Sequence, residues 1–127
     1  MRPAFAIFLL ASALVAVDSQ VVVHTGTLFN FVPGLGACGF TNTSSQTVAS
    51  VSNHTFNTFA GATANPNNNP ICKHSLNITH GGTHLAVPIV DFCASCPDEN
   101  IGLSTPGFVH FAPTSAGIVT GVSWSIV

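Results

Sequence analysis

The sequence predicts a small all-β domain, most simply a β-barrel. Short apolar runs are separated by clusters of Gly, Pro and Asn, and no long stretch keeps a helical period. The last residues alternate instead, so that Ile118, Thr120, Val122, Trp124 and Ile126 share one face of a predicted closing strand. We expect this face to place Trp124 in the core. Many short strands joined by Gly- and Pro-rich turns are typical of a barrel.

Two strand regions are expected in the first half of the domain. The opening strand region comprises residues 21–31, and residues 47–51 form a further strand candidate. Between them lies the turn Pro33-Gly-Leu-Gly36, whose glycines can adopt positive φ. Residues 64–70, which are rich in Asn and Pro, are expected to form a polar loop.

The second half is expected to contain a β-hairpin and a short helix. The apolar residues 76–79 and 85–90 flank Gly81-Gly82, a pair suited to a hairpin turn. Farther along, the stretch from Ser104 to Phe111 predicts a short helix with Ser104 as its N-cap.

The N-terminal residues have the features of a secretory signal peptide. One Arg precedes an apolar run at residues 4–17, and Val17-Asp18-Ser19 offers small residues at a cleavage point. The run is shorter than the roughly 20 residues of a membrane-spanning helix, which disfavours a membrane anchor. We therefore expect residues 1–19 to be a signal peptide and residues 20–127 to form one secreted domain, with no membrane association after cleavage.

Secretion gives the cysteines their most direct interpretation. An even number in a small secreted domain predicts disulfides, and four cysteines allow three pairings. The four are Cys38, Cys72, Cys93 and Cys96. Only one C-x-x-C pair is present, which disfavours a zinc site, and it follows a strand, which disfavours a redox motif. Sequons predict three solvent-facing glycosylation sites, at Asn42, Asn53 and Asn77.

Charge excludes several classes of partner. After the leader the chain has one basic residue, Lys73, so it lacks a basic patch for nucleic acid or an anionic membrane. The carboxylates of the domain are Asp91, Asp98 and Glu99. A surface with so little charge suits neutral partners such as uncharged polysaccharide. The histidines are His24, His54, His74, His80, His84 and His110. Three of them, near the hairpin turn, could bind Zn or Cu, but no carboxylate stands among them, so we expect no metal and no cofactor.

Three motifs, in their order and spacing, resemble those of a known family. They are Pro33-Gly-Leu-Gly-Ala-Cys-Gly39, Ala64-Asn-Pro-Asn-Asn-Asn-Pro-Ile-Cys72 and Val90-Asp-Phe-Cys-Ala-Ser-Cys96, followed by Leu-Ser and the strand with Trp124. The set is similar to that of secreted fungal RlpA-like, expansin-related proteins of the barwin-like superfamily, which include the loosenins. The resemblance covers nearly the whole domain. It implies a six-stranded double-psi β-barrel with one or two short helices, the pairings Cys38–Cys72 and Cys93–Cys96, and association with the cell wall.

The resemblance also implies where a polysaccharide groove should lie. The wider group has Thr and Tyr on the first strand, an Asp at a strand end with an aromatic residue nearby, and an Asp before Leu-Ser. Asp91 matches the strand-end Asp, whereas Phe29, Asn30 and Gly102 stand at the Thr, Tyr and second Asp positions. We predict substrate-binding positions at Asp91, Phe29, Asn30 and Phe92, with Asp91 as the one candidate catalytic residue.

Catalysis is not expected from this set. Glycoside hydrolysis normally needs two positioned carboxylates, and the usual partner of Asp91 is missing. Asp98 or Glu99 could approach it from the following loop, although charges in such loops are usually solvated. The structural alternative for Asp91 is a carboxylate that accepts hydrogen bonds from loop amides.

The sequence therefore predicts a secreted, monomeric, non-catalytic protein that binds or loosens cell-wall polysaccharide such as cellulose, chitin or β-glucan. The first alternative, from a different class, is a protein-binding module, either a protease inhibitor or an effector, built on the same barrel. The second alternative is a degenerate glycoside hydrolase. The expected location is extracellular, at the cell wall.

Overall fold

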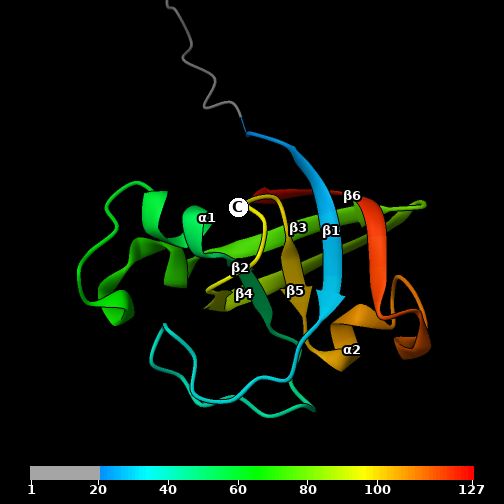
Figure 1. Ribbon diagram of the computed structural model, residues 1–127, viewed down its shortest axis with the longest axis horizontal. Helices are drawn as coiled ribbons and strands as arrows, with labels where there is room; N and C mark the ends of the chain where they lie inside the picture. The colour runs from blue at the N-terminus through cyan, green and yellow to red at the C-terminus, as the bar shows by residue number, and fades with distance from the viewer. Residues whose placement is uncertain (1–20) are drawn as a thin grey trace, which may run out of the picture.

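The computed structural model describes residues 21–127 of the chain. The predicted signal peptide and its cleavage site lie outside these residues. Within them, six strands form the closed barrel drawn in Figure 1. The strands are β1 (His24–Asn30), β2 (Ala49–Ser52), β3 (Ser75–His80), β4 (Thr83–Cys93), β5 (Ile101–Leu103) and β6 (Ile118–Ile126).

The strands follow one another around the barrel in the order β1-β5-β2-β4-β3-β6. The β1–β5 and β2–β4 pairs are parallel, and the other pairs are antiparallel. A parallel pair cannot be joined by a tight hairpin, so long connections run between strands that are not neighbours. The closed all-β barrel with two short helices and two disulfides confirms the predicted fold class.

Short helices occupy these connections. They are α1 (Asn53–Thr58), η1 (Pro66–Asn68), η2 (Pro70–Lys73), α2 (Thr105–Phe108) and η3 (Thr114–Ala116), where η marks a 3-10 helix. The sequence patterns predict α2 but not α1. α1 begins directly after β2 because the hydroxyl of Ser52 accepts a hydrogen bond from the Thr55 amide and caps it. Only Phe56 of this helix is buried, so a six-residue segment shows little apolar periodicity.

Ser104 precedes α2 as predicted, but it does not act as a side-chain cap. No hydrogen bond joins its hydroxyl to the helix amides. The hydroxyl instead donates to the Gln46 carbonyl at 2.6 Å and accepts from the Val48 amide at 2.9 Å. Ser104 is buried, and it therefore ties the segment that leads into β2 to the start of α2.

The predicted hairpin is confirmed. β3 and β4 pair from Ser75↔Pro88 to His80↔Thr83, and the turn between them consists of Gly81 and Gly82. Their φ angles are 55° and 79°, a conformation that favours glycine and that twists in the same sense as the strands.

The predicted alternation of the last strand is correct only in its second part. Val122 and Trp124 are buried, but Ile118 is 55% exposed and Val119 packs against the core in its place. The register between β1 and β6 shifts in this region, and Gly121 has φ of 68°. The shift is a β-bulge, which inserts one extra residue and exchanges the two faces of the strand before it.

The barrel interior is a single hydrophobic core. Its largest members are Trp124, Phe56 and Phe108, so the core position predicted for Trp124 is confirmed. The indole Nε1 of Trp124 donates to the Glu99 carbonyl at 3.0 Å, which satisfies its one polar group. The ring of His24 stacks on the indole with centroids 4.2 Å apart.

Two disulfides secure the connections. Cys38 pairs with Cys72, which joins the β1–β2 connection to η2, and Cys93 pairs with Cys96 in the turn after β4. Both pairings implied by the family resemblance are thus confirmed. No helix between residues 21 and 127 has the length and apolarity needed to cross a membrane.

Candidate functional site

A row of residues in register crosses four adjacent strands. Phe29 of β1 lies opposite Gly102 of β5, Gly102 opposite Ser50 of β2, and Ser50 opposite Asp91 of β4. Residues in register on neighbouring strands point to the same face of a sheet. The buried side chains of the adjacent row face the core, so Phe29 and Asp91 both belong to the outer face. The barrel therefore brings together two of the four predicted binding residues.

The centre of this row is filled by aromatic rings. A Cβ atom added to Gly102 would lie 2.8 Å from Cε2 and Cζ of Phe29 and 3.2 Å from Cδ1 of Phe31. Both distances are shorter than ordinary van der Waals contacts, so the rings occupy the space of a side chain at residue 102. The position where the resemblance expects a second carboxylate is thus covered by an apolar surface.

The carboxylate of Asp91 is engaged by backbone amides. Its Oδ1 accepts hydrogen bonds from the Ala37 amide at 3.0 Å and from its neighbour Phe92 at 2.8 Å. Gly36 approaches so closely that an added Cβ would lie 2.4 Å from the Val90 carbonyl oxygen. Asp91 therefore anchors the connection between β1 and β2 to the end of β4. This is the structural role considered for it above.

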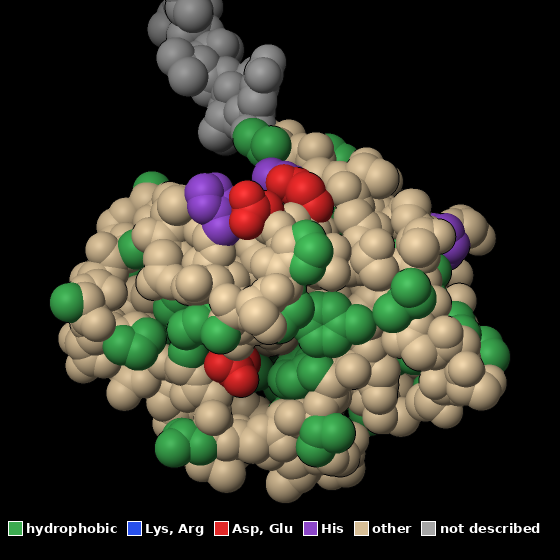
Figure 2. All heavy atoms as spheres, in the orientation of Figure 1, with side chains coloured by type: hydrophobic (Ala, Val, Ile, Leu, Met, Phe, Trp, Pro, Cys, Tyr) green, Lys and Arg blue, Asp and Glu red, His purple; other side chains and the backbone are tan. Residues whose placement is uncertain are grey.

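The other two carboxylates among residues 21–127 have different surroundings. Figure 2 shows acidic side chains beside histidines near one edge of this face, and an acidic side chain in a hollow bordered by hydrophobic side chains. Glu99 pairs with Nδ1 of His24 at 2.8 Å, and Asp98 lines a pocket beside α1. Among the described residues, neither is hydrogen-bonded to Asp91 or shares a hydrogen-bond partner with it.

The other two predicted binding residues, Asn30 and Phe92, contact other parts of the protein. The Asn30 amide donates to the Leu103 carbonyl and to the Thr105 hydroxyl, both at 3.2 Å, and so joins β1 to α2. Phe92 follows Asp91 in the strand and points to the opposite face, where its ring lies 4.9 Å from that of the buried Phe56. The substrate-binding role of Asn30 and Phe92 remains a prediction.

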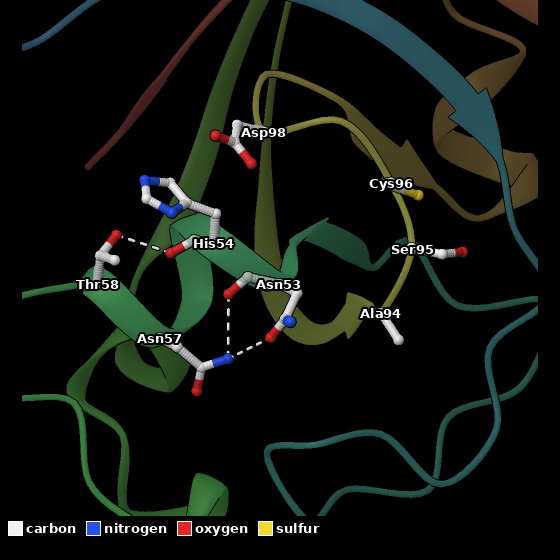
Figure 3. Close-up of a pocket in the computed structure, with 8 residues that line it drawn as sticks. All are labelled: Asn53, His54, Asn57, Thr58, Ala94, Ser95, Cys96 and Asp98. Carbon is white, nitrogen blue, oxygen red and sulfur yellow. Dashed lines mark hydrogen bonds between the residues drawn. The ribbon is translucent and has the colours of Figure 1, made fainter.

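A polar pocket beside α1 has no counterpart among the sequence predictions. It has a volume of about 470 Å³ and is drawn in Figure 3. Its lining residues are Asn53, His54, Asn57, Thr58, Ala94, Ser95, Cys96 and Asp98. The α1 wall is internally braced, since the Asn57 amide donates to the Asn53 carbonyl at 3.0 Å and the Thr58 hydroxyl to the His54 carbonyl at 2.7 Å. Figure 3 shows the His54 ring and the Asp98 carboxylate at the same end of the pocket.

A sequence signal for this pocket exists in retrospect. Asn53, His54, Asn57 and Thr58 recur at the spacing of one helical face. A smaller pocket of about 290 Å³ lies on the other side of His54 and includes His24 and Glu99. In the region from residue 21 to 127, His, Cys, Asp and Glu form no group of three or more that could hold a metal ion.

The three sequons differ in exposure. Asn53 is exposed, whereas Asn42 and Asn77 are half-buried. Asn77 lies in β3 between Ala86 and Ser125 of the neighbouring strands. The expectation that all three face solvent therefore applies fully only to Asn53.

The strand order, the disulfides and the closed barrel define this chain as a double-psi β-barrel protein. Comparison with solved structures identifies the family within that fold. A structure of the Streptomyces papain inhibitor matches with a TM-score of 0.75 and 32% identity, over 84% of this chain and 94% of that chain. The chain belongs to the family of this papain inhibitor. The curated papain inhibitor of Streptomyces mobaraensis is 35% identical over 96 residues, which span 74% of this chain and 64% of its own length.

More distant likeness is limited to the fold. Two structures of Clavibacter michiganensis expansin, one without ligand and one of a mutant in complex with cellohexaose, match with TM-scores of 0.66 and 19% identity. They cover 84% of this chain and 50% of those chains. No family model matches the sequence. The resemblance to expansin-related barrels therefore holds for the fold, whereas the relatives named here are bacterial rather than fungal.

Proposed function

We propose that this protein is a non-catalytic, secreted barrel that binds and inhibits a cysteine protease of the papain class. The observation that carries the proposal is the 32% identity that extends over 94% of the chain in the solved structure of the Streptomyces papain inhibitor. This is the first alternative of the sequence-based prediction, and it replaces polysaccharide binding as the preferred function.

The geometry around Asp91 supports a non-catalytic role. Glycosidases place two carboxyl groups about 5–9.5 Å apart across the bond that they cleave. Here the Asp91 carboxylate holds a loop amide, and aromatic rings cover Gly102, where the resemblance expects the second acid. Both amide hydrogen bonds go to Oδ1 of Asp91, and the position of the expected second acid is a glycine covered by rings, so the carboxylate pair of a glycosidase is not formed there.

Secretion, glycosylation and monomeric state belong to the same proposal. All four cysteines are paired in disulfides, which persist in oxidising compartments. The N-terminal signal sequence and the exposed Asn53 sequon support an extracellular glycoprotein.

Polysaccharide binding at a cell wall is the second candidate, and the polar pocket beside α1 favours it. Amide, hydroxyl and carboxylate side chains from Asn53, Asn57, Thr58 and Asp98 line one concave surface that carries no Lys or Arg. Such groups exchange hydrogen bonds with sugar hydroxyls. An expansin barrel of the same fold was solved with cellohexaose.

One titration separates the two candidates. Disulfide-intact protein is added to papain and the hydrolysis of a fluorogenic peptide is followed, while the same preparation is incubated with cellulose, chitin and β-glucan. Stoichiometric inhibition of papain without retention on any polymer would support the first proposal. Retention on a polymer without inhibition of papain-class enzymes would overturn it in favour of the second. A parallel assay for reducing sugars tests the non-catalytic assignment.

A further inference from the structure

We infer that the β1–β2 loop, residues 31–48, is the inhibitory surface and that its apolar tip enters the substrate cleft of a papain-class protease. The inference rests on the proposed function and adds to it the contact surface and its positioning residue, Asp91. Three properties of this loop suit it to the role: the side chains that it exposes, the rigidity of its fold and its attachment to the barrel.

The loop exposes large apolar side chains close together in sequence. Val32 is 81% exposed, Leu35 76% and Phe40 55%. The loop contains no charged residue. In Figure 1 it runs in cyan along the lower edge of the molecule, and Figure 2 shows hydrophobic side chains projecting at that edge, below the hollow. Burial of these apolar side chains in a complex would be favourable. Several exposed apolar side chains on one segment are typical of a protein contact site.

Residues 34–42, which we call the tip of the loop, form a small closed hairpin whose turn is held against the barrel. Leu35 and Thr41 form a β-bridge, the Gly36 amide donates to the Phe40 carbonyl at 3.0 Å, and the Asn42 amide donates to the Gly34 carbonyl at 2.9 Å. These bonds present Leu35 and Phe40 from the two arms of one hairpin. A segment that is already ordered loses little conformational entropy on binding, which is the property that an inhibitor needs.

The hairpin is attached to the barrel at its centre. The Cys38 amide donates to the Val90 carbonyl at 3.1 Å, the Ala37 amide donates to Oδ1 of Asp91 at 3.0 Å, and Cys38 is bonded to Cys72. Asp91 is thus the side chain that sets the height and angle of the tip. The row of residues that resembles a sugar groove acts here as the support of a binding loop.

A protease cleft is the occupant that these features favour. Ligand clefts are concave and largely apolar, so an exposed, uncharged apolar surface complements them. A second copy of this chain fits less well, because a stable dimer buries about 1,600 Å² and three side chains on one loop offer only part of that area. The relative that shares this architecture is an inhibitor of papain.

The first experiment measures the inhibition constant against papain for Leu35→Ala and Phe40→Ala. The matched control is Val127→Ala, because Val127 is 52% exposed and lies at the C-terminus, away from the loop in Figure 1. We expect each loop variant to inhibit at least about 10-fold more weakly and the control to match the wild type. If the wild type inhibits papain and all variants have the same inhibition constant, the assignment of the loop is overturned while the proposed function stands. A wild type that inhibits no papain-class enzyme would overturn both.

The second experiment tests the positioning role of Asp91. Asp91→Asn keeps an oxygen that can accept from the Ala37 amide, whereas Asp91→Ala removes it. We expect Asp91→Asn to retain inhibition. We expect Asp91→Ala to weaken it and to accelerate amide hydrogen exchange at residues 36–40 and at Phe92, whose amide also donates to Oδ1, but not elsewhere in the strands. Similar loss in both variants would show that the charge, rather than the anchoring bond, matters, and would overturn this role.

Discussion

The contact between Phe29 and Gly102 predicts that Gly102→Ala changes the stability of the protein in a direction that depends on whether Phe29 is present. Gly102 is buried in β5, and a Cβ there would lie 2.8 Å from two ring atoms of Phe29. Those atoms are at the far end of a half-buried ring, so the ring can move aside, but it loses packing as it does. We expect Gly102→Ala to lower the free energy of unfolding by about 1–2 kcal/mol, within the range of overpacked cores.

Removing the ring should reverse the effect. In a Phe29→Ala background the two atoms nearest to the added Cβ are removed, and Cδ1 of Phe31 remains at 3.2 Å. Ala then gains the entropic advantage that it has over Gly in a strand, about 0.5–1 kcal/mol. The same Gly102→Ala change is therefore expected to be neutral or stabilising when the ring is absent.

The assay is a double-mutant cycle. Urea unfolding of wild type, Phe29→Ala, Gly102→Ala and the double variant gives a coupling energy, which we expect to reach about 1.5 kcal/mol or more. Additive effects, within about 0.5 kcal/mol, would refute the claim that the ring fills the position of the missing side chain. Gly102→Asp extends the series, since a buried carboxylate beside two rings should cost more than Ala in both backgrounds.

Three further changes test the rest of the architecture. Replacing both Cys38 and Cys72 by Ser opens a loop of sequence separation 34 and should cost about 4 kcal/mol on the chain-entropy model, and an unchanged melting temperature would contradict it. Ser104→Ala leaves the Val48 amide without its hydrogen-bond partner and should lower the free energy of unfolding, measured in urea, by about 1–3 kcal/mol, more than an exposed Ser→Ala change does. A loss below about 0.5 kcal/mol would mean that the hydroxyl does not support β2. Gly121→Ala forces a Cβ into the positive φ of the bulge and should lower stability by about 1–2 kcal/mol; equal stability would mean that the bulge relaxes.

Much of the fold could be predicted from local features of the sequence. The Gly81-Gly82 pair predicts the hairpin because the turn needs two positive φ angles, which only glycine adopts without strain. Apolar alternation predicts Trp124 in the core, since the period of a strand is the same wherever the strand lies. The disulfide pairs followed from the family resemblance, because four cysteines alone leave three pairings open.

The candidate site was less predictable, because its residues meet only through the barrel. Phe29, Gly102 and Asp91 come from three strands that are far apart in the sequence, and a sequence pattern does not show which side chain fills another's space. The face that Phe92 occupies depends on the same register, since neighbouring residues in a strand take opposite faces and only the register decides which face is buried.

The sequence by itself determined the all-β class, the hairpin and the core position of Trp124, because each depends on residues adjacent in the chain or on a simple period. Tertiary structure alone decided that Ser104 supports β2 instead of capping α2, that the bulge at Gly121 exposes Ile118, and that Asp91 holds the Ala37 amide. These outcomes depend on which hydrogen-bond partner and which free volume the closed barrel brings to each side chain.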